Sequence, residues 1–116
     1  MAKAKKRSLT RELFLKELVI KPIEVDVNGV TIYVKPASEL KRSQRAAQMF
    51  DKKGEMDQRY LEKRRVLALI DHLCDENGEP LFTEKDTKDL QELDSFQIDP
   101  YFQAIDIALG EESGNE

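Results

Sequence analysis

The sequence predicts a single, mainly helical α+β domain in which an antiparallel β-hairpin, at about residues 23–34, packs on three to five helices. Three observations lead to this prediction. Two segments of alternating apolar and polar residues flank an Asn-Gly dipeptide. Most of the remaining chain shows capping residues followed by apolar residues at helical spacing. The length of 116 residues is that of about one domain.

The hairpin is predicted by local chemistry. Residues 23–27 and 30–34 each alternate, and Asn28-Gly29 between them tolerates the positive φ angles of a type I′ turn. Closing the turn there gives three aliphatic pairs on one face: Val27 with Val30, Val25 with Ile32, and Ile23 with Val34. Because an isolated hairpin is only marginally stable in water, we expect helices to cover this face.

Two helices are expected around the hairpin in the first half of the chain. The first covers residues 9–18 with Ser8 as its cap, although its apolar residues do not form one stripe. The second begins after the cap Ser38, runs to about Lys53 and stops at Gly54. The side of this helix expected to pack inward carries Leu40, Ala47 and Phe50.

In the second half of the chain, the sequence predicts a central helix and two later helices. Residues 57–74 form the central helix, whose apolar residues fall within about 60° of Ile70 when about 100° is counted per residue. They are Val66, Leu67, Ile70, Leu73 and Cys74. A polar turn over 75–80 follows, and then a short helix, with the capping pattern Thr83 and Asp86, ends near Leu93. A last helix is expected from Asp99-Pro100 to Gly110.

Charge and composition describe a folded chain with polar ends. We expect a flexible basic arm at 1–7, one domain over 8–110, and a disordered acidic tail at 111–116. Residues 1–21 carry a net charge of +5 and residues 75–116 one of −11. Such polarity suits contact between copies of the chain, or with an oppositely charged partner, and it equally serves solubility. The longest apolar run, residues 66–70, is far below the roughly 20 residues of a membrane span, so no membrane association is expected.

The sequence predicts no enzyme, no cofactor and no metal. His72 is expected to face solvent without a nucleophile near it, and Cys74 lies on the apolar stripe, where a thiol packs as a small hydrophobe. One cysteine and one histidine cannot complete a zinc set. A calcium-loop template over residues 73–84 would place Leu73, which has no oxygen ligand, at its first position. We therefore name no catalytic, cofactor-binding or metal-binding residue.

Three apolar residues lie away from the predicted core faces and are candidates for protein interaction: Tyr33, Leu61 and Ile107. Leu61 lies about 180° around its helix from Ile70, and Ile107 about 200° from Ile105. Tyr33 lies on the polar face of the hairpin. These residues can line a protein interface if they cluster in space, and single exposed apolar residues are also ordinary on a monomer.

The order of several short motifs along the chain resembles that of a known protein family. The residues concerned are Phe14-Leu15-Lys16, the strand after Pro22, Asn28-Gly29-Val30-Thr31-Ile32, Ser38-Glu39-Leu40, Gln44-Arg45 and the stretch 74–82. In this order, with this length and an acidic ending, the chain resembles tail assembly chaperones of long-tailed bacteriophages, the minor tail protein G-like family of phages with non-contractile tails.

The resemblance implies a non-enzymatic protein made in the cytoplasm of an infected or prophage-bearing bacterium. Such a chaperone binds the tape measure protein, helps recruit tail tube protein and is absent from the mature virion. The resemblance also implies a homo-oligomer and, commonly, a longer product made by translational frameshifting. Copies with oppositely charged ends that meet head to tail form rings or open spirals.

Two other functions stay open. A small nucleic-acid-binding regulator would use the basic arm and Lys63-Arg64-Arg65 to contact phosphates. A pI near 5.2 and the lack of a series of base-stacking aromatic residues argue against it. A structural head–tail or tail component retained in the virion would share the chain's size and mixed α/β character.

Overall fold

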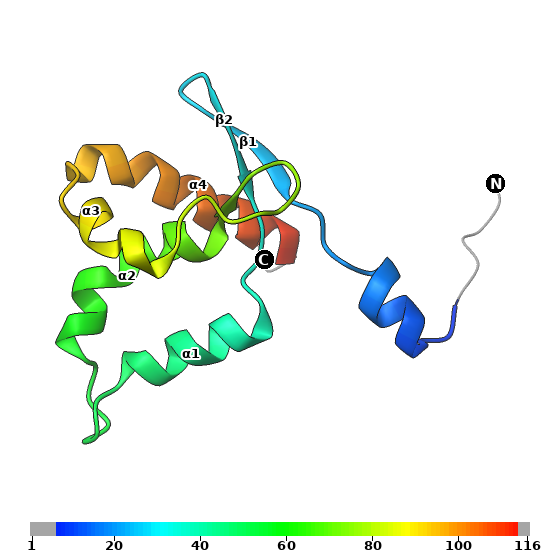
Figure 1. The fold of residues 1–116 in the computed structure, drawn as a ribbon, viewed down its shortest axis with the longest axis horizontal. Helices are drawn as coiled ribbons and strands as arrows, with labels where there is room; N and C mark the ends of the chain where they lie inside the picture. The colour runs from blue at the N-terminus through cyan, green and yellow to red at the C-terminus, as the bar shows by residue number, and fades with distance from the viewer. Residues whose placement is uncertain (1–6, 114–116) are drawn as a thin grey trace.

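The computed structural model describes residues 7–113 and confirms a single α+β domain with helices packed around a small antiparallel sheet (Figure 1). The predicted arm and tail fall largely outside this range. In chain order the elements are η1 (Leu13–Glu17), β1 (Ile23–Val27), β2 (Val30–Val34), α1 (Glu39–Met49), α2 (Gln58–His72), β3 (Leu73–Cys74), η2 (Glu84–Asp86), α3 (Thr87–Gln91) and α4 (Ser95–Ser113).

The hairpin forms in the predicted register. β1 and β2 are antiparallel, and their pairs run from Ile23 with Val34 to Val27 with Val30. Asn28 and Gly29 both have positive φ angles, 52° and 86°, as a type I′ turn requires. Asp26 Oδ2 accepts a hydrogen bond from the Gly29 amide at 3.3 Å, which holds the turn.

A third strand, β3, extends the sheet and was not predicted. It comprises only Leu73 and Cys74, which pair antiparallel with Val34 and Tyr33 of β2. The helix expected over 57–74 therefore ends at His72. Its start is as expected, because the Asp57 side chain accepts a hydrogen bond from the Arg59 amide.

The core lies between the hairpin, α2 and α4. α2 packs on both α4 and α3, and α4 also covers β1 (Figure 1). The buried cluster consists of Val27, Ile32, Val34, Val66, Leu67, Leu69, Ile70, Leu73, Leu90, Ile98, Ile105 and Ala108. The aliphatic face of the hairpin is thus covered by helices, as its sequence pattern requires.

The last helix is longer at both ends than predicted. α4 begins at Ser95, because Asp94 Oδ1 accepts a hydrogen bond from the Phe96 amide at 3.0 Å and starts the helix ahead of Pro100. It also continues past Gly110 to Ser113. Gly110 is not among the residues with positive φ, and a glycine ends a helix by adopting that conformation.

Two predictions about the other helices are wrong. α1 has the expected cap, Ser38, but it ends at Met49, and Leu40, Ala47 and Phe50 are exposed instead of packed. α1 contacts α2 (Figure 1), but the side chain that it buries there is Arg45, paired with Asp71 of α2, instead of an apolar residue. The first helix is capped by Thr10 rather than Ser8, since Thr10 Oγ1 accepts a hydrogen bond from the Leu13 amide.

The fold leaves much surface uncovered. The accessible surface is 9288 Å², whereas a compact monomer of 13.4 kDa exposes about 6,500 Å². The nine residues outside the described range account for at most about 1,400 Å² of this difference, even at the exposure of an unfolded chain. The radius of gyration is 16.9 Å, against about 13 Å for a compact chain of this length. The excess surface is where partners are to be sought.

Candidate protein-binding grooves

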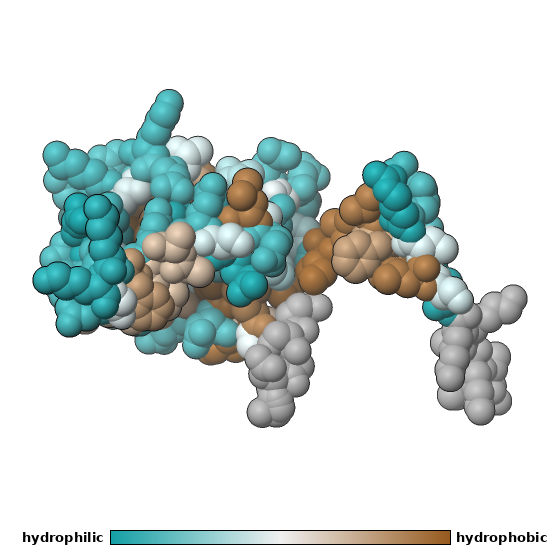
Figure 2. Space-filling model, turned by 90° about the horizontal axis from the view of Figure 1, so that it is seen from below, coloured by the Kyte–Doolittle hydropathy of each residue, from teal (hydrophilic) through white to brown (hydrophobic). Residues whose placement is uncertain are grey.

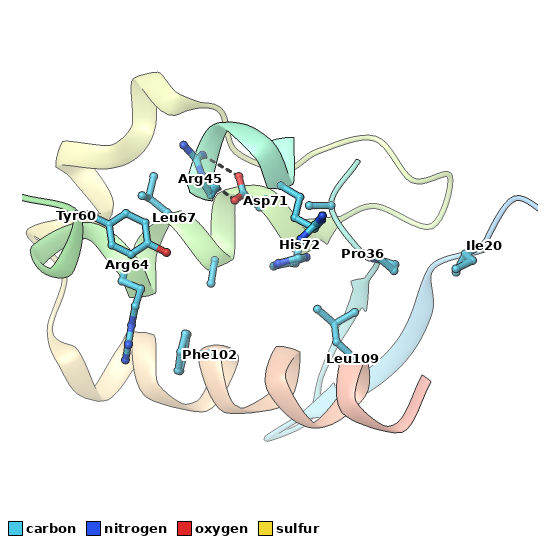
Figure 3. A pocket seen from close by; sticks show the side chains of 13 residues that line it. Ile20, Pro36, Arg45, Tyr60, Arg64, Leu67, Asp71, His72, Phe102 and Leu109 are labelled. Carbon is cyan, nitrogen blue, oxygen red and sulfur yellow. Dashed lines mark hydrogen bonds and ion pairs between the residues drawn. The ribbon is translucent and has the colours of Figure 1, made fainter. Parts of the chain in front are cut away.

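A hollow of about 520 Å³ lies between α1, α2 and α4 (Figure 3). We call it the central groove. Its apolar lining comes from two helices, from the loop before α1 and from the chain before β1: Tyr60, Leu67 and Ala68 of α2, Phe102 and Leu109 of α4, Pro36 and Ala37 of the loop, and Ile20. In Figure 3, Phe102 and Leu109 face the α2 side chains across the groove. The groove exists because α1 does not close over α2.

One end of the central groove is built on a buried ion pair between α1 and α2. Arg45 Nε and Nη2 each donate to a different oxygen of the Asp71 carboxylate, both at 2.8 Å. The two side chains are only 10% and 6% exposed. The hydrogen bond from Arg45 to Asp71 is the largest cause that raises the pKa of Arg45, so this guanidinium stays charged. Two parallel bonds fix the orientation of α1 on α2.

The rim of the central groove is basic. Arg42 and Arg64 are exposed residues of its lining, from α1 and α2. His72 also lines it and was predicted to face solvent, but it is half-buried. Its Nδ1 lies 2.9 Å from the carbonyl oxygen of Lys35, so Nδ1 carries the proton and donates. The Lys35 amide in turn donates to the His72 carbonyl oxygen at 3.0 Å, so the chain after β2 is held against the end of α2.

Glu84 extends the buried ion pair to the surface and gives it a pH dependence. It accepts hydrogen bonds from Lys41 at 3.1 Å and from Arg45 at 3.0 Å. The bond from Lys41, and then those from Arg45, hold the pKa of Glu84 below its ordinary 4.5. These contacts therefore stabilise the fold above about pH 4.5, and the contribution is lost as the pH falls through the lowered pKa.

We expect Glu84→Gln to be less stable than the parent at about pH 7 by less than about 1 kcal/mol, because half of the side chain is in water. The difference should shrink as the pH falls through the lowered pKa of Glu84, since the parent carboxylate then takes up a proton as well. Urea unfolding followed by circular dichroism at about pH 7 and at a series of pH values below about 4.5 measures this. Glu92→Gln, an exposed position on another part of the surface, is the control. An identical pH dependence for both variants would contradict the assignment.

The N-terminal segment, residues 9–20, projects from the body and carries the most concentrated exposed apolar surface (Figures 1 and 2). Six of its residues are between 49% and 65% exposed: Leu9, Phe14, Leu15, Leu18, Val19 and Ile20. η1 takes part in none of the principal packing contacts between the elements. Burying what remains exposed is worth about 1 kcal/mol or more for each side chain. Such a segment is typical of a protein-binding surface.

A second hollow of about 490 Å³ runs between β1 and α4, and we call it the acidic groove. Its apolar lining includes Ile23 and Val25 of β1 and Ala104 and Ile107 of α4. Two acidic residues, Glu24 and Asp26, and no basic residue belong to its lining. The acidic groove thus differs in charge from the central groove.

The three residues predicted to contact a partner lie on different elements. Ile107, on α4, lines the acidic groove and is 61% exposed. Leu61 is exposed on α2, and Tyr33 is half-buried on β2 opposite Cys74. Neither of these two lines either groove.

The basic run Lys63-Arg64-Arg65 does not form one face. Arg65 is paired with Asp99 and lies over the Phe102 ring, 5.4 Å from its centroid. Arg64 lines the central groove, and Lys63 lines a different hollow beside α1. Three consecutive helical residues point in three directions, so the run presents no continuous strip to a phosphate backbone.

The described part of the chain shows neither a metal-binding cluster nor a membrane span. Among residues 7–113 there is no group of three or more His, Cys, Asp or Glu side chains that could hold a metal ion. Within the same residues no helix is long and apolar enough to cross a membrane. Cys74 is buried beside Tyr33, and burial raises the pKa of its thiol, so it packs as a neutral group.

Sequence reasoning missed the two features that define this surface. The Arg45–Asp71 pair joins residues far apart in sequence, and the spacing of apolar residues does not indicate which charged side chains are buried. The N-terminal segment did leave a signal, because Leu13, Phe14, Leu15 and Leu18 do not form one stripe. A segment that is apolar on several sides cannot bury itself on one core, and this can be recognised as a sign of an external partner.

The chain that carries these grooves has the fold of a phage tail assembly chaperone. The chain is similar to the solved structure of the tail assembly chaperone of bacteriophage HK97, with a TM-score of 0.56 and 18% sequence identity. The similarity covers 83% of this chain and 94% of the HK97 chain. No family model and no curated protein matches the chain. The resemblance read from the sequence is thereby confirmed at the level of the fold.

Proposed function

We propose that this chain is a non-enzymatic phage tail assembly chaperone that binds the tape measure protein, promotes assembly of the tail tube and self-associates while doing so. The observation that carries the proposal is the shared fold with the HK97 tail assembly chaperone over 83% of the chain. The uncovered apolar surface supports it, since a chaperone needs surface that is free until its client arrives.

The proposal includes where the protein acts. It works in the cytoplasm of an infected or prophage-bearing bacterium and is absent from the mature virion. A longer, frameshifted product would recruit the tail tube protein. Mass spectrometry of purified particles tests this part, because a structural tail component would be found in them in stoichiometric amounts.

The central groove is the surface that we assign to the tape measure protein. Its floor is apolar, and Arg42 and Arg64 lie on its rim. An amphipathic helix with apolar anchors and acidic flanking residues fits such a surface, since its apolar side enters the groove while its carboxylates meet the arginines. We therefore expect the bound segment of the tape measure protein to be helical and acidic.

Two variants of the central groove test this assignment. Ala68→Arg fills the groove, and Arg64→Glu reverses the charge of its rim while leaving the core untouched. We expect each to weaken binding of tape measure fragments at least about tenfold, as the loss of a central contact does. Co-expression followed by co-purification detects the complex, and titration calorimetry measures the dissociation constant.

Lys52→Glu is the matched control, because it makes the same charge reversal on an exposed residue between α1 and α2, away from the groove. It should bind like the parent. If the parent itself forms no complex with any tape measure fragment, the proposed function is wrong. If Arg64→Glu and Lys52→Glu bind equally well, the client lies elsewhere on the chaperone.

A further inference from the structure

We propose that the N-terminal segment of one copy docks in the acidic groove of a second copy of the same chain. This inference rests on the self-association that forms part of the proposed function. It adds which two surfaces meet, and it separates that contact from the one made with the client.

Most of the N-terminal segment does not pack on the rest of its own chain. It is joined to β1 through Lys21 and Pro22. The residue before a proline is restricted to extended conformations, so the chain leaves β1 without turning back along it. Val19 and Ile20, next to β1, still line hollows of their own body, whereas the apolar side chains nearer the N-terminus stand away from it (Figure 2). A segment that projects on an extended connection can pack on a second copy of the chain, as in domain swapping.

Charge selects the acidic groove as its receptor. Arg11 and Lys21 of the segment and its root are exposed, and neither forms an ion pair with another described side chain. The acidic groove offers Glu24 and Asp26, and Asp106 lies exposed next to Ile107 on α4. The other charges of the segment are paired locally, Lys16 with Glu12 and Glu17 with Arg7, so Arg11 and Lys21 are the charges left to meet a partner. The arginines on the rim of the central groove disfavour them. Complementary potentials favour one pairing and like charges disfavour the other.

The amount of surface agrees with one such contact for each copy. About 1,400 Å² of the exposed area exceeds what a compact monomer shows, after the undescribed residues are allowed for. A standard protein interface buries about 1,600 Å² in total, shared between its two sides. Each copy contributes one segment and one groove, so a single type of contact would bury the exposed area that exceeds that of a compact monomer.

Cysteine cross-linking between separately prepared copies tests the pairing directly. Leu15→Cys changes an exposed residue of the segment, and Ile107→Cys changes an exposed residue of the groove. The native Cys74 is buried and need not be removed. We expect a mixture of the two full-length variants, under mild oxidation, to give a disulfide between one chain of each kind. Leu40→Cys, on α1 outside both grooves and more exposed than Leu15, is the matched control and should not cross-link to Ile107→Cys.

Self-association of the full chain provides the second measurement. Leu15→Asp should raise the dissociation constant between copies at least about tenfold, measured by analytical ultracentrifugation. Glu24→Lys should raise it about two- to fivefold, and Lys21→Glu should restore it, because the pair is exposed. Leu40→Asp should leave it unchanged.

The inference is overturned if Leu40→Cys cross-links to Ile107→Cys as efficiently as Leu15→Cys does, or if a single chain carrying both Leu15→Cys and Ile107→Cys closes on itself while remaining a monomer. It is also overturned if Leu15→Asp associates like the parent. None of these results touches the proposed function, provided that the same variants still co-purify with the tape measure protein through the central groove. Loss of that complex in the parent would instead remove the proposed function.

Discussion

Replacing Asp71 with alanine is expected to lower the free energy of unfolding by about 3–5 kcal/mol, the cost of leaving one member of a buried ion pair without its partner. Arg45 would keep its charge, with Gln48 and the half-exposed Glu84 as its remaining hydrogen-bond acceptors. Domains of this size are stable by only about 5–15 kcal/mol, so this single change removes a large share. Urea unfolding followed by circular dichroism measures it.

The buried position decides the size of this effect. Arg42→Ala breaks an ion pair with Glu39 on the exposed face of α1 and should cost less than about 1 kcal/mol. A double change, Arg45→Met with Asp71→Leu, should recover most of the stability, because packed apolar groups often replace a buried pair without loss. If Asp71→Ala unfolds like Arg42→Ala, the ion pair does not hold α1 in place.

The same pair connects stability to binding. Four hydrogen-bonding atoms fix the angle at which α1 lies on α2, and Arg45 and Asp71 both line the central groove. The double apolar variant should therefore fold but hold α1 less specifically. We expect it to bind the tape measure protein more weakly than the parent, although its stability is nearly that of the parent.

The elements that the sequence predicts well are those whose conformation is decided by neighbouring residues. The hairpin is correct to the residue because the Asn28-Gly29 turn and the alternation of its strands specify the same register. Ser38 and Thr83 are correct as caps for a similar reason, since each accepts a hydrogen bond from an amide two or three residues ahead.

The elements that the sequence predicts poorly are those decided by distant contacts. β3 has two residues, too few to show an alternation, and it exists because β2 offers an edge to the end of α2. The inward face of α1 was predicted from Leu40 and Phe50, but the structure buries Arg45 there, because its partner Asp71 lies on another helix. The candidate grooves depend on these same placements. Of the predicted interaction residues, only Ile107 lines one of the two grooves.

Ile105 and Ile107 allow stability and assembly to be separated on a single helix. Ile105 is 3% exposed in the core, and Ile107, two residues later on α4, is 61% exposed in the acidic groove. Ile105→Ala is expected to cost about 2–5 kcal/mol, because it removes buried methyl groups and leaves a cavity between α4 and α2. Ile107→Ala should cost less than about 0.5 kcal/mol, as a surface substitution does.

The effects of the two substitutions on self-association should be the reverse of their effects on stability. Ile107→Ala removes part of the floor on which we place the N-terminal segment of a second copy, so it should weaken self-association while the unfolding midpoint stays at that of the parent. Ile105→Ala should leave the acidic groove intact under conditions where the chain is folded, and so associate like the parent. Denaturant unfolding and analytical ultracentrifugation of the same two samples supply both measurements. If instead the loss of association follows the loss of stability, Ile107 acts only as part of the fold, and the acidic groove is not the contact between copies.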